Sequence, residues 1–198
     1  MRALFLLALF LLAACSSYTV VVDLAPEQDP SLVEAWTFPL PRVVTETRVT
    51  LDGRVPQEGY RLSYGAPSLP FPPRRLELRL DGVLGRSTRC VRELSGTVQV
   101  QLYLGPPDML WGHPVGDRLD FDLARSQLAL TVATRLDEAQ EAALFSGELA
   151  VGASVAGEVR LAPDTGDACA DPDNPDQINA ELGVRLRLDR MVVRTELY

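Results

Sequence analysis

The sequence has 198 residues, enough for one domain with a substantial hydrophobic core, and its 27 acidic and 19 basic residues give a formal net charge of −8. This acidic balance argues against nucleic acid as a partner and against electrostatic docking on anionic lipid headgroups. Every basic residue is arginine, which excludes a Schiff-base lysine and the lysine of a phosphate-binding loop.

The first fifteen residues have the order of charge and hydropathy that is typical of an export signal. Arg2 precedes an uninterrupted apolar run over residues 3–12, and two alanines then lead into Cys15. The run is too short to span a bilayer. The sequence therefore predicts that residues 1–14 form a signal peptide and that residues 15–198 form one mature domain.

The stretch Leu12-Ala13-Ala14-Cys15 resembles the lipobox of bacterial lipoproteins. The resemblance implies cleavage before Cys15, acylation of its thiol and, usually, of the new N-terminus, and attachment to the membrane through this lipid. It also implies location in the cell envelope. An Asp after the lipidated Cys commonly retains Gram-negative lipoproteins in the inner membrane, so Ser16 favours the periplasmic side of the outer membrane where the host has one. The alternative is an ordinary secretory signal with a chance cysteine.

Alternation of apolar and polar residues dominates the mature chain and predicts antiparallel strands. The β-branched run 18–24 predicts a strand, and Asp29-Pro30 predicts the start of a short helix over 31–36. The prolines of 39–41 are expected to stop regular structure, and those of 65–73 predict an extended loop. Further strands are predicted over residues 43–51, 60–64, 76–80, 98–104, 119–123, 128–132, 149–161 and 180–188.

Local signals refine this pattern. Asp52-Gly53 predicts a turn, and a slip in the alternation near Asp189-Arg190 predicts a β-bulge. Asp137 and Gln140 have the spacing of a capping box, which predicts the start of a short helix. Gly147 would end this helix. The sequence as a whole predicts an all-β protein: an antiparallel β-sandwich or a partly open barrel of about nine strands, with one short helix.

Two cysteines remain once Cys15 carries lipid, namely Cys90 and Cys169. An exported domain lies in a compartment that permits disulfides, and an even number of remaining cysteines favours one bridge. Closing a loop of that length would stabilise the fold by roughly 4 kcal/mol. The alternative is a pair of separate buried thiols.

The loop 105–116 is the first candidate site, because it contains Met109, Leu110, Trp111 and His113, the only histidine. Apolar residues on a long loop are a common means of contacting a partner or ligand. The alternative, which we favour, is that the three apolar residues fold back and plug one end of the sandwich.

The loop 162–176 is the second candidate, because it is rich in aspartate and carboxylate oxygens suit Ca²⁺. The glycine and the closing glutamate of an EF-hand loop are missing, however. We therefore expect a solvated turn in which Cys169 is linked to Cys90, and we predict no metal site.

The sequence offers no set of catalytic residues, so we expect a non-enzymatic protein without a cofactor. Its predicted role is structural or protein-interacting, in the cell envelope and anchored by lipid. The alternative is a carrier or chaperone that holds an apolar ligand such as a lipid between its sheets. Ala153, Gly157 and Ala180 would leave room for such a ligand, but they would equally permit close packing of the sheets.

Overall fold

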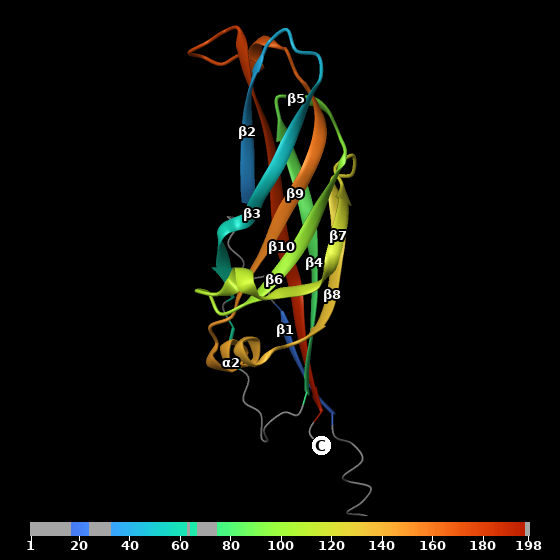
Figure 1. Ribbon diagram of the computed structural model, residues 1–198, viewed down its shortest axis with the longest axis vertical. Coiled ribbons are helices and arrows are strands. Elements are labelled where there is room, and N and C mark those ends of the chain that lie inside the picture. Colours follow the sequence, from blue (N-terminus) through green and yellow to red (C-terminus); the bar gives the residue numbers. More distant parts are fainter. Residues whose placement is uncertain (1–16, 24–32, 63, 67–74, 197–198) are drawn as a thin grey trace, which may run out of the picture.

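The computed structural model describes residues 17–23, 33–62, 64–66 and 75–196. The predicted signal peptide, Cys15, the Asp29-Pro30 cap and most of the predicted loop 65–73 lie outside these residues. The described residues contain ten strands in two antiparallel sheets, which pack face to face in an elongated sandwich (Figure 1).

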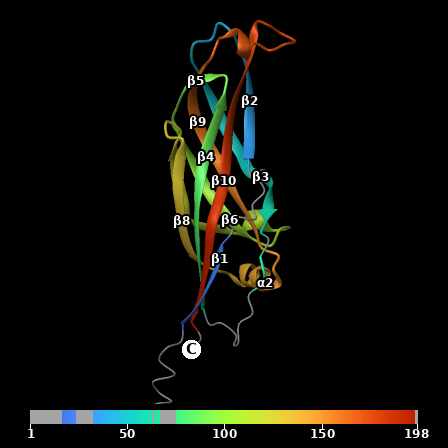
Figure 2. The ribbon, with the colours of Figure 1, turned by 180° about the vertical axis from the view of Figure 1, so that it is seen from behind.

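The first sheet is organised around β10, the longest of the described strands. Its five strands are β1 (Ser17–Asp23), β2 (Val33–Pro41), β4 (Arg75–Arg89), β8 (Gln127–Arg135) and β10 (Gln177–Glu196). One side of β10 pairs with β4, and its other side pairs first with β2 and then with β1. Beyond β4, β8 completes the sheet, as the view from behind in Figure 2 shows.

The second sheet is organised around β9 in the same way. Its five strands are β3 (Thr47–Arg61), β5 (Val91–Ser95), β6 (Thr97–Gly105), β7 (Pro114–Asp122) and β9 (Ala150–Pro163). One side of β9 pairs with β3, and the other side pairs with β6 and then with β5. A helix α2 (Glu138–Ser146) and two 3₁₀ turns, η2 (Leu110–Gly112) and η3 (Asp167–Cys169), complete the described elements.

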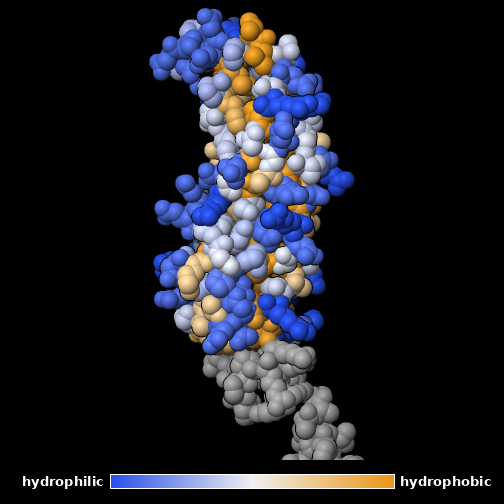
Figure 3. Space-filling view, viewed as in Figure 1, coloured by the Kyte–Doolittle hydropathy of each residue, from blue (hydrophilic) through white to orange (hydrophobic). Residues whose placement is uncertain are grey.

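The alternation seen in the sequence places one face of each strand in the core. In β4, Leu78 is fully buried, whereas Glu77 and Arg79 on either side of it are exposed. In β6, Val100 and Leu102 are buried in the same way. Each such side chain contributes about 1.5–3 kcal/mol when it leaves water, and together these residues form one continuous core. Hydrophilic side chains cover much of the outer surface (Figure 3).

The predicted helix over residues 31–36 is wrong, because the chain from Val33 onward is the strand β2. The edge of β10 offers β2 a hydrogen-bonding partner, and Trp36 and Phe38 pack against the core from this strand. Contrary to the expectation, Pro39 lies inside this strand and does not stop it, whereas Pro41 is its last residue. An edge strand tolerates proline, since β2 pairs only with β10 and its other side needs no donors.

The predicted turn at Asp52-Gly53 is also wrong, because both residues lie inside β3. A Cβ atom added to Gly53 would lie 2.7 Å from Cζ2 of Trp36, so the glycine is needed for the close approach of β2 rather than for a turn. The strand predicted over 43–51 begins only at Thr47, and Val43 in the preceding turn is 87% exposed.

The predicted capping box is confirmed. Oδ1 of Asp137 accepts the N–H of Gln140 at 2.9 Å, and Oε1 of Gln140 accepts the N–H of Asp137 at 2.8 Å. The side-chain amide of Gln140 also donates to the carbonyl of Leu104 at 2.7 Å, which ties α2 to β6. Gly147 ends the helix in the left-handed conformation, with φ of 77°.

The fold class is therefore confirmed in its sandwich form, and the ten strands of the described residues agree with the expected number of about nine. The bulge predicted near Asp189-Arg190 is present, since the register of β10 against β4 shifts between Leu188 and Arg190. In the part of the chain that the structure describes, no helix is both long and apolar enough to cross a bilayer.

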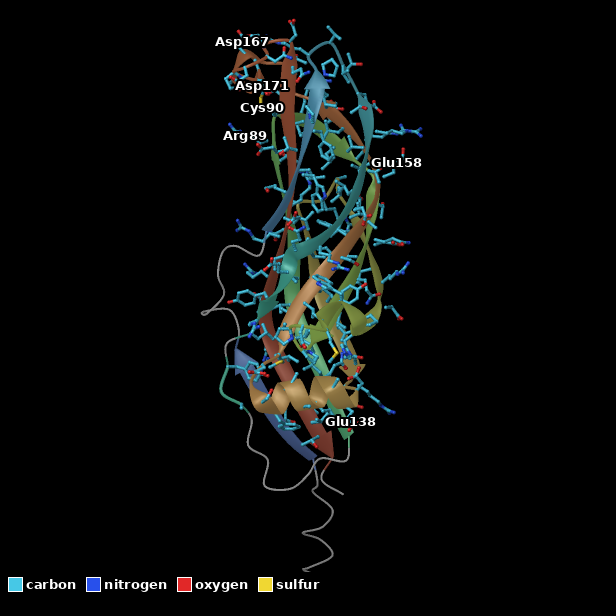
Figure 4. The ribbon with its side chains drawn as sticks, turned by 60° about the vertical axis from the view of Figure 1, so that its left-hand side comes forward. Arg89, Cys90, Glu138, Glu158, Asp167 and Asp171 are labelled. Carbon is cyan, nitrogen blue, oxygen red and sulfur yellow. A yellow bond between two sulfur atoms is a disulfide. The ribbon has the colours of Figure 1, made fainter. Side chains whose placement is uncertain are left out.

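The two ends of the sandwich carry different elements. At one end, the first residue of β1, Ser17, lies opposite Glu196 of β10, and α2 lies nearby (Figure 1). The disulfide and the aspartate-rich loop 162–176, which we call the acidic loop, lie at the opposite end, as the labels of Cys90, Asp167 and Asp171 show in Figure 4. We call these the α2 end and the disulfide end.

Candidate functional sites

The disulfide end is tied together by the predicted bridge, which is present. Cys90 lies between β4 and β5, Cys169 lies in η3, and their Cα atoms are 5.4 Å apart. The N–H of Asp164 donates to the carbonyl of Cys90 at 3.0 Å, so the two segments are also joined by their backbones.

Arg42 provides a second link at this end. Its guanidinium donates to the carbonyl of Thr165 at 3.1 and 3.2 Å and forms an ion pair with Asp167. Its backbone N–H donates to the carbonyl of Asp176 at 2.8 Å. The turn between β2 and β3 is thereby bonded both to the first part of the acidic loop, at Thr165 and Asp167, and to its last residue, Asp176.

Asp171 organises the acidic loop from within. Its carboxylate accepts the backbone N–H groups of Asp173 and Asn174, at 2.8 and 3.2 Å, and the amide of Asn179 at 2.6 Å. These bonds, the one from Asp173 above all, hold the pKa of Asp171 below its ordinary value. Among the described residues, no group of three or more His, Cys, Asp and Glu side chains is arranged to hold a metal ion.

The apolar residues of the 105–116 loop differ in how deeply they are buried. Leu110 is 1% exposed, and its side chain fills the space beside Gly59, where a Cβ atom would overlap it. Met109, its neighbour, is 53% exposed. Of the three residues predicted to form the plug, Met109, Leu110 and Trp111, only Leu110 therefore has the deep burial expected of one.

Trp111 lies on the outer face of the second sheet rather than between the sheets. It packs over Gly152, where a Cβ atom would be 2.6 Å from Cη2 of the indole. Its ring meets the ring of Tyr103 edge-on at 5.2 Å, and the guanidinium of Arg54 lies 4.6 Å from its centroid. The half-buried Trp111 thus belongs to an aromatic and cationic cluster on the surface.

His113 joins the same loop to α2. Its Nδ1 lies 2.8 Å from Oδ2 of Asp137, while Oδ1 of that carboxylate caps the helix. Burial acts to raise the pKa of Asp137, but the hydrogen bonds from Gln140 and His113 outweigh it and hold the pKa below its ordinary value. The carboxylate therefore stabilises both the helix and the loop while it is ionised.

We expect Asp137→Ala to lower the free energy of unfolding by about 1 kcal/mol at neutral pH, the usual cost of losing an N-cap. Because the pKa of Asp137 is lower in the folded state, this stabilisation is complete above about pH 4, the ordinary pKa, and is lost as the pH falls through the folded value. Urea unfolding of both proteins across this range is the measurement. Asp137→Asn, which keeps an oxygen for the N–H of Gln140, should cost less, and a deficit of Asp137→Ala that does not change with pH would contradict the assignment.

A groove of about 600 Å³ opens where β2 and β3 lie side by side, at the edges of their two sheets. We call it the β2–β3 groove. Its lining includes Glu34, Trp36, Asp52, Arg54, Gln57 and Tyr103. Sequence reasoning missed these residues. No local pattern marks them, because the meeting of residues so far apart in the chain depends on the sandwich itself.

Comparisons with protein-family models and with curated protein sequences give no match. Three solved structures show low similarity. A structure of infectious bursal disease virus, Gx strain, is 12% identical with a TM-score of 0.24, over 93% of this chain and 37% of that chain. A putative glycoside hydrolase from Bacteroides thetaiotaomicron is 8% identical with a TM-score of 0.27, over 68% of this chain and 40% of that one. A bacterial lipoprotein from the same organism is 13% identical with a TM-score of 0.26, over 92% and 84%.

The chain thus spans less than half the length of the first two of these structures. At such TM-scores none of the three likenesses carries an argument about function. The class of protein rests on the structure itself, which is an antiparallel β-sandwich closed at one end by a disulfide.

Proposed function

We propose that the protein is a lipid-anchored lipoprotein of the cell envelope with a non-enzymatic, structural or protein-interacting role. The observation that carries this proposal is the lipobox-like stretch Leu12-Ala13-Ala14-Cys15 at the end of an export signal. The lipid would hold the protein to the outer membrane, on its periplasmic side, where the host has one.

The geometry of the chain gives this anchor a direction. Cys15 precedes Ser17, the first residue of β1, by two residues, which span at most about 7 Å. An anchored molecule would therefore keep its α2 end at the membrane. Because β10 has 20 residues and runs most of the length of the sandwich, the disulfide end would stand about 60 Å from the bilayer (Figure 1).

The bonding partners of the cysteine and histidine side chains support a non-enzymatic role. Cys90 and Cys169 are joined in a disulfide, so neither is a thiol nucleophile. His113, the only histidine, is bonded to the carboxylate that caps α2. The tied disulfide end, where Val43 is 87% exposed next to Arg42, would instead serve as a surface for another envelope protein.

Packing at the small core residues favours this role over that of a lipid carrier. A Cβ atom added to Gly157 would lie 3.0 Å from Cα and 3.1 Å from Cγ1 of Val98, so the space inside Gly157 is filled by β6. Ala153 and Ala180 are fully buried. The close contact at Gly157 supports tight packing of the sheets, whereas a carrier needs an open cavity.

We expect Cys15→Ser to release the protein from membranes, because acylation needs the thiol of Cys15. The measurement is the distribution of the protein between the membrane pellet and the supernatant after a high-salt wash. Ser16→Ala is the matched control, since it alters the neighbouring residue and leaves the thiol, and it should stay in the pellet. A Cys15→Ser protein that still pellets would contradict the anchor.

A further inference from the structure

The β2–β3 groove differs from the rest of the surface in its combination of aromatic rings and unpaired polar groups. Trp36 and Tyr103 contribute the rings, and its volume of about 600 Å³ is that of a site for a small molecule or a short segment of polymer. With respect to the described residues, the side chains of Glu34, Asp52 and Gln57 take part in no hydrogen bond or ion pair. Their hydrogen-bonding atoms are therefore available to a ligand.

The charges in the groove limit the chemistry of that ligand. Glu34 and Asp52 are acceptors only, whereas Arg54 is a donor only and Gln57 is both. An anion would be repelled by the two carboxylates, and a simple cation would leave the donors of Arg54 without an acceptor. An apolar ligand would bury these charged groups without partners, at a high cost. The groove consequently favours an uncharged ligand that both donates and accepts hydrogen bonds.

The aromatic rings add a second requirement, because they bind best to a ligand that also presents an apolar face. The indole of Trp36 is held in place by the close approach of Gly53 and by a bond of 3.4 Å from its Nε1 to the carbonyl of Asp52. Tyr103 is held by its edge-on contact with Trp111. Rings fixed in this way lose little conformational freedom when a ligand binds.

We infer that the β2–β3 groove binds a neutral saccharide chain. Its hydroxyl groups would donate to Glu34 and Asp52 and accept from Arg54 and Gln57, while the C–H faces of its rings would lie against Trp36 and Tyr103. This inference rests on the proposed function, since it names the class of partner that the anchored protein would meet in the envelope.

The test uses the full, detergent-solubilised chain with two neutral probes, cellohexaose and chitohexaose. Binding is followed by intrinsic fluorescence, because the two tryptophans of the sequence are Trp36 in the groove and Trp111 beside its residues Arg54 and Tyr103. We expect saturable binding of at least one probe, with an affinity that does not change at high salt, as for an uncharged ligand.

The variant Asp52→Ala with Gln57→Ala removes two of the proposed contacts. Both residues are exposed and lack partners among the described residues, so the fold should be unaffected. The matched control is Asp120→Ala with Gln99→Ala, an exposed pair that lies in register on the same sheet outside the groove. We expect the groove variant to bind at least about tenfold more weakly and the control to bind like the unaltered protein.

Hexamannuronate serves as an anionic comparison probe under the same conditions. The proposal is overturned if the unaltered chain binds neither neutral hexasaccharide, whether or not it binds hexamannuronate. It is also overturned if the groove variant binds as tightly as the control. These results would leave the anchor intact, because the anchor is measured by the pelleting of Cys15→Ser. Conversely, a chain that binds saccharide but does not pellet would refute only the anchor.

Discussion

Replacing both Cys90 and Cys169 with serine is expected to lower the free energy of unfolding by about 4 kcal/mol. The bridge joins residues 79 positions apart, and opening it frees the unfolded chain from a loop of that length. In a domain of this size the change corresponds to a fall of about 10 °C in Tm. Thermal unfolding followed by circular dichroism, without reductant, measures it.

Reductant supplies the control for this prediction. Dithiothreitol should lower the Tm of the unaltered protein to that of the double variant and should leave the variant unchanged. If reductant has no effect on the unaltered protein, the bridge does not contribute to stability as described. The acidic loop would then be held by the contacts of Arg42 and Asp171 and by the backbone bond from Asp164 to Cys90.

Leu110→Ala is expected to lower the free energy of unfolding by about 3 kcal/mol, within the usual range for a buried leucine. Leu110 is 1% exposed and fills the space beside Gly59, so its truncation leaves a cavity between the 105–116 loop and β3. Urea unfolding gives the size of the effect.

Met109→Ala is the matched control, because it truncates the adjacent apolar side chain, which is 53% exposed. Its effect should stay within about 0.5 kcal/mol. Equal effects of the two substitutions would contradict the assignment of Leu110 as the plug.

The sequence predicts correctly those elements in which the local pattern of apolar residues matches the residues that the core buries. In β4 and β6, one residue in two faces the opposite sheet, so the alternation around Leu78 and Val100 is itself the signature of the fold. The capping box of α2 is also local, since Asp137 and Gln140 bond to each other within one turn. Such features need no knowledge of distant residues.

The errors lie where a distant partner decides the conformation. Residues 33–36 form a strand because β10 offers an edge, and no signal for that edge exists near Val33. Gly53 has the sequence of a turn but serves the approach of Trp36. The difference between these two roles of glycine cannot be seen without the packed structure.

The candidate sites divide in the same way. The disulfide could be predicted, because only two cysteines remain after Cys15 and an exported protein favours their pairing. The β2–β3 groove could not, since Glu34, Asp52 and Tyr103 belong to three strands in two sheets. Only the packing of the sheets brings them together.

The intact mass of the protein purified from its own membranes tests the lipid anchor most directly. We predict a chain that begins at Cys15, lacks residues 1–14 and carries the added mass of acyl groups on its first residue. The same spectrum should show a loss of two hydrogens for the Cys90–Cys169 disulfide. A chain that retains Met1, or one that begins at Cys15 or beyond without acyl mass, would contradict the account.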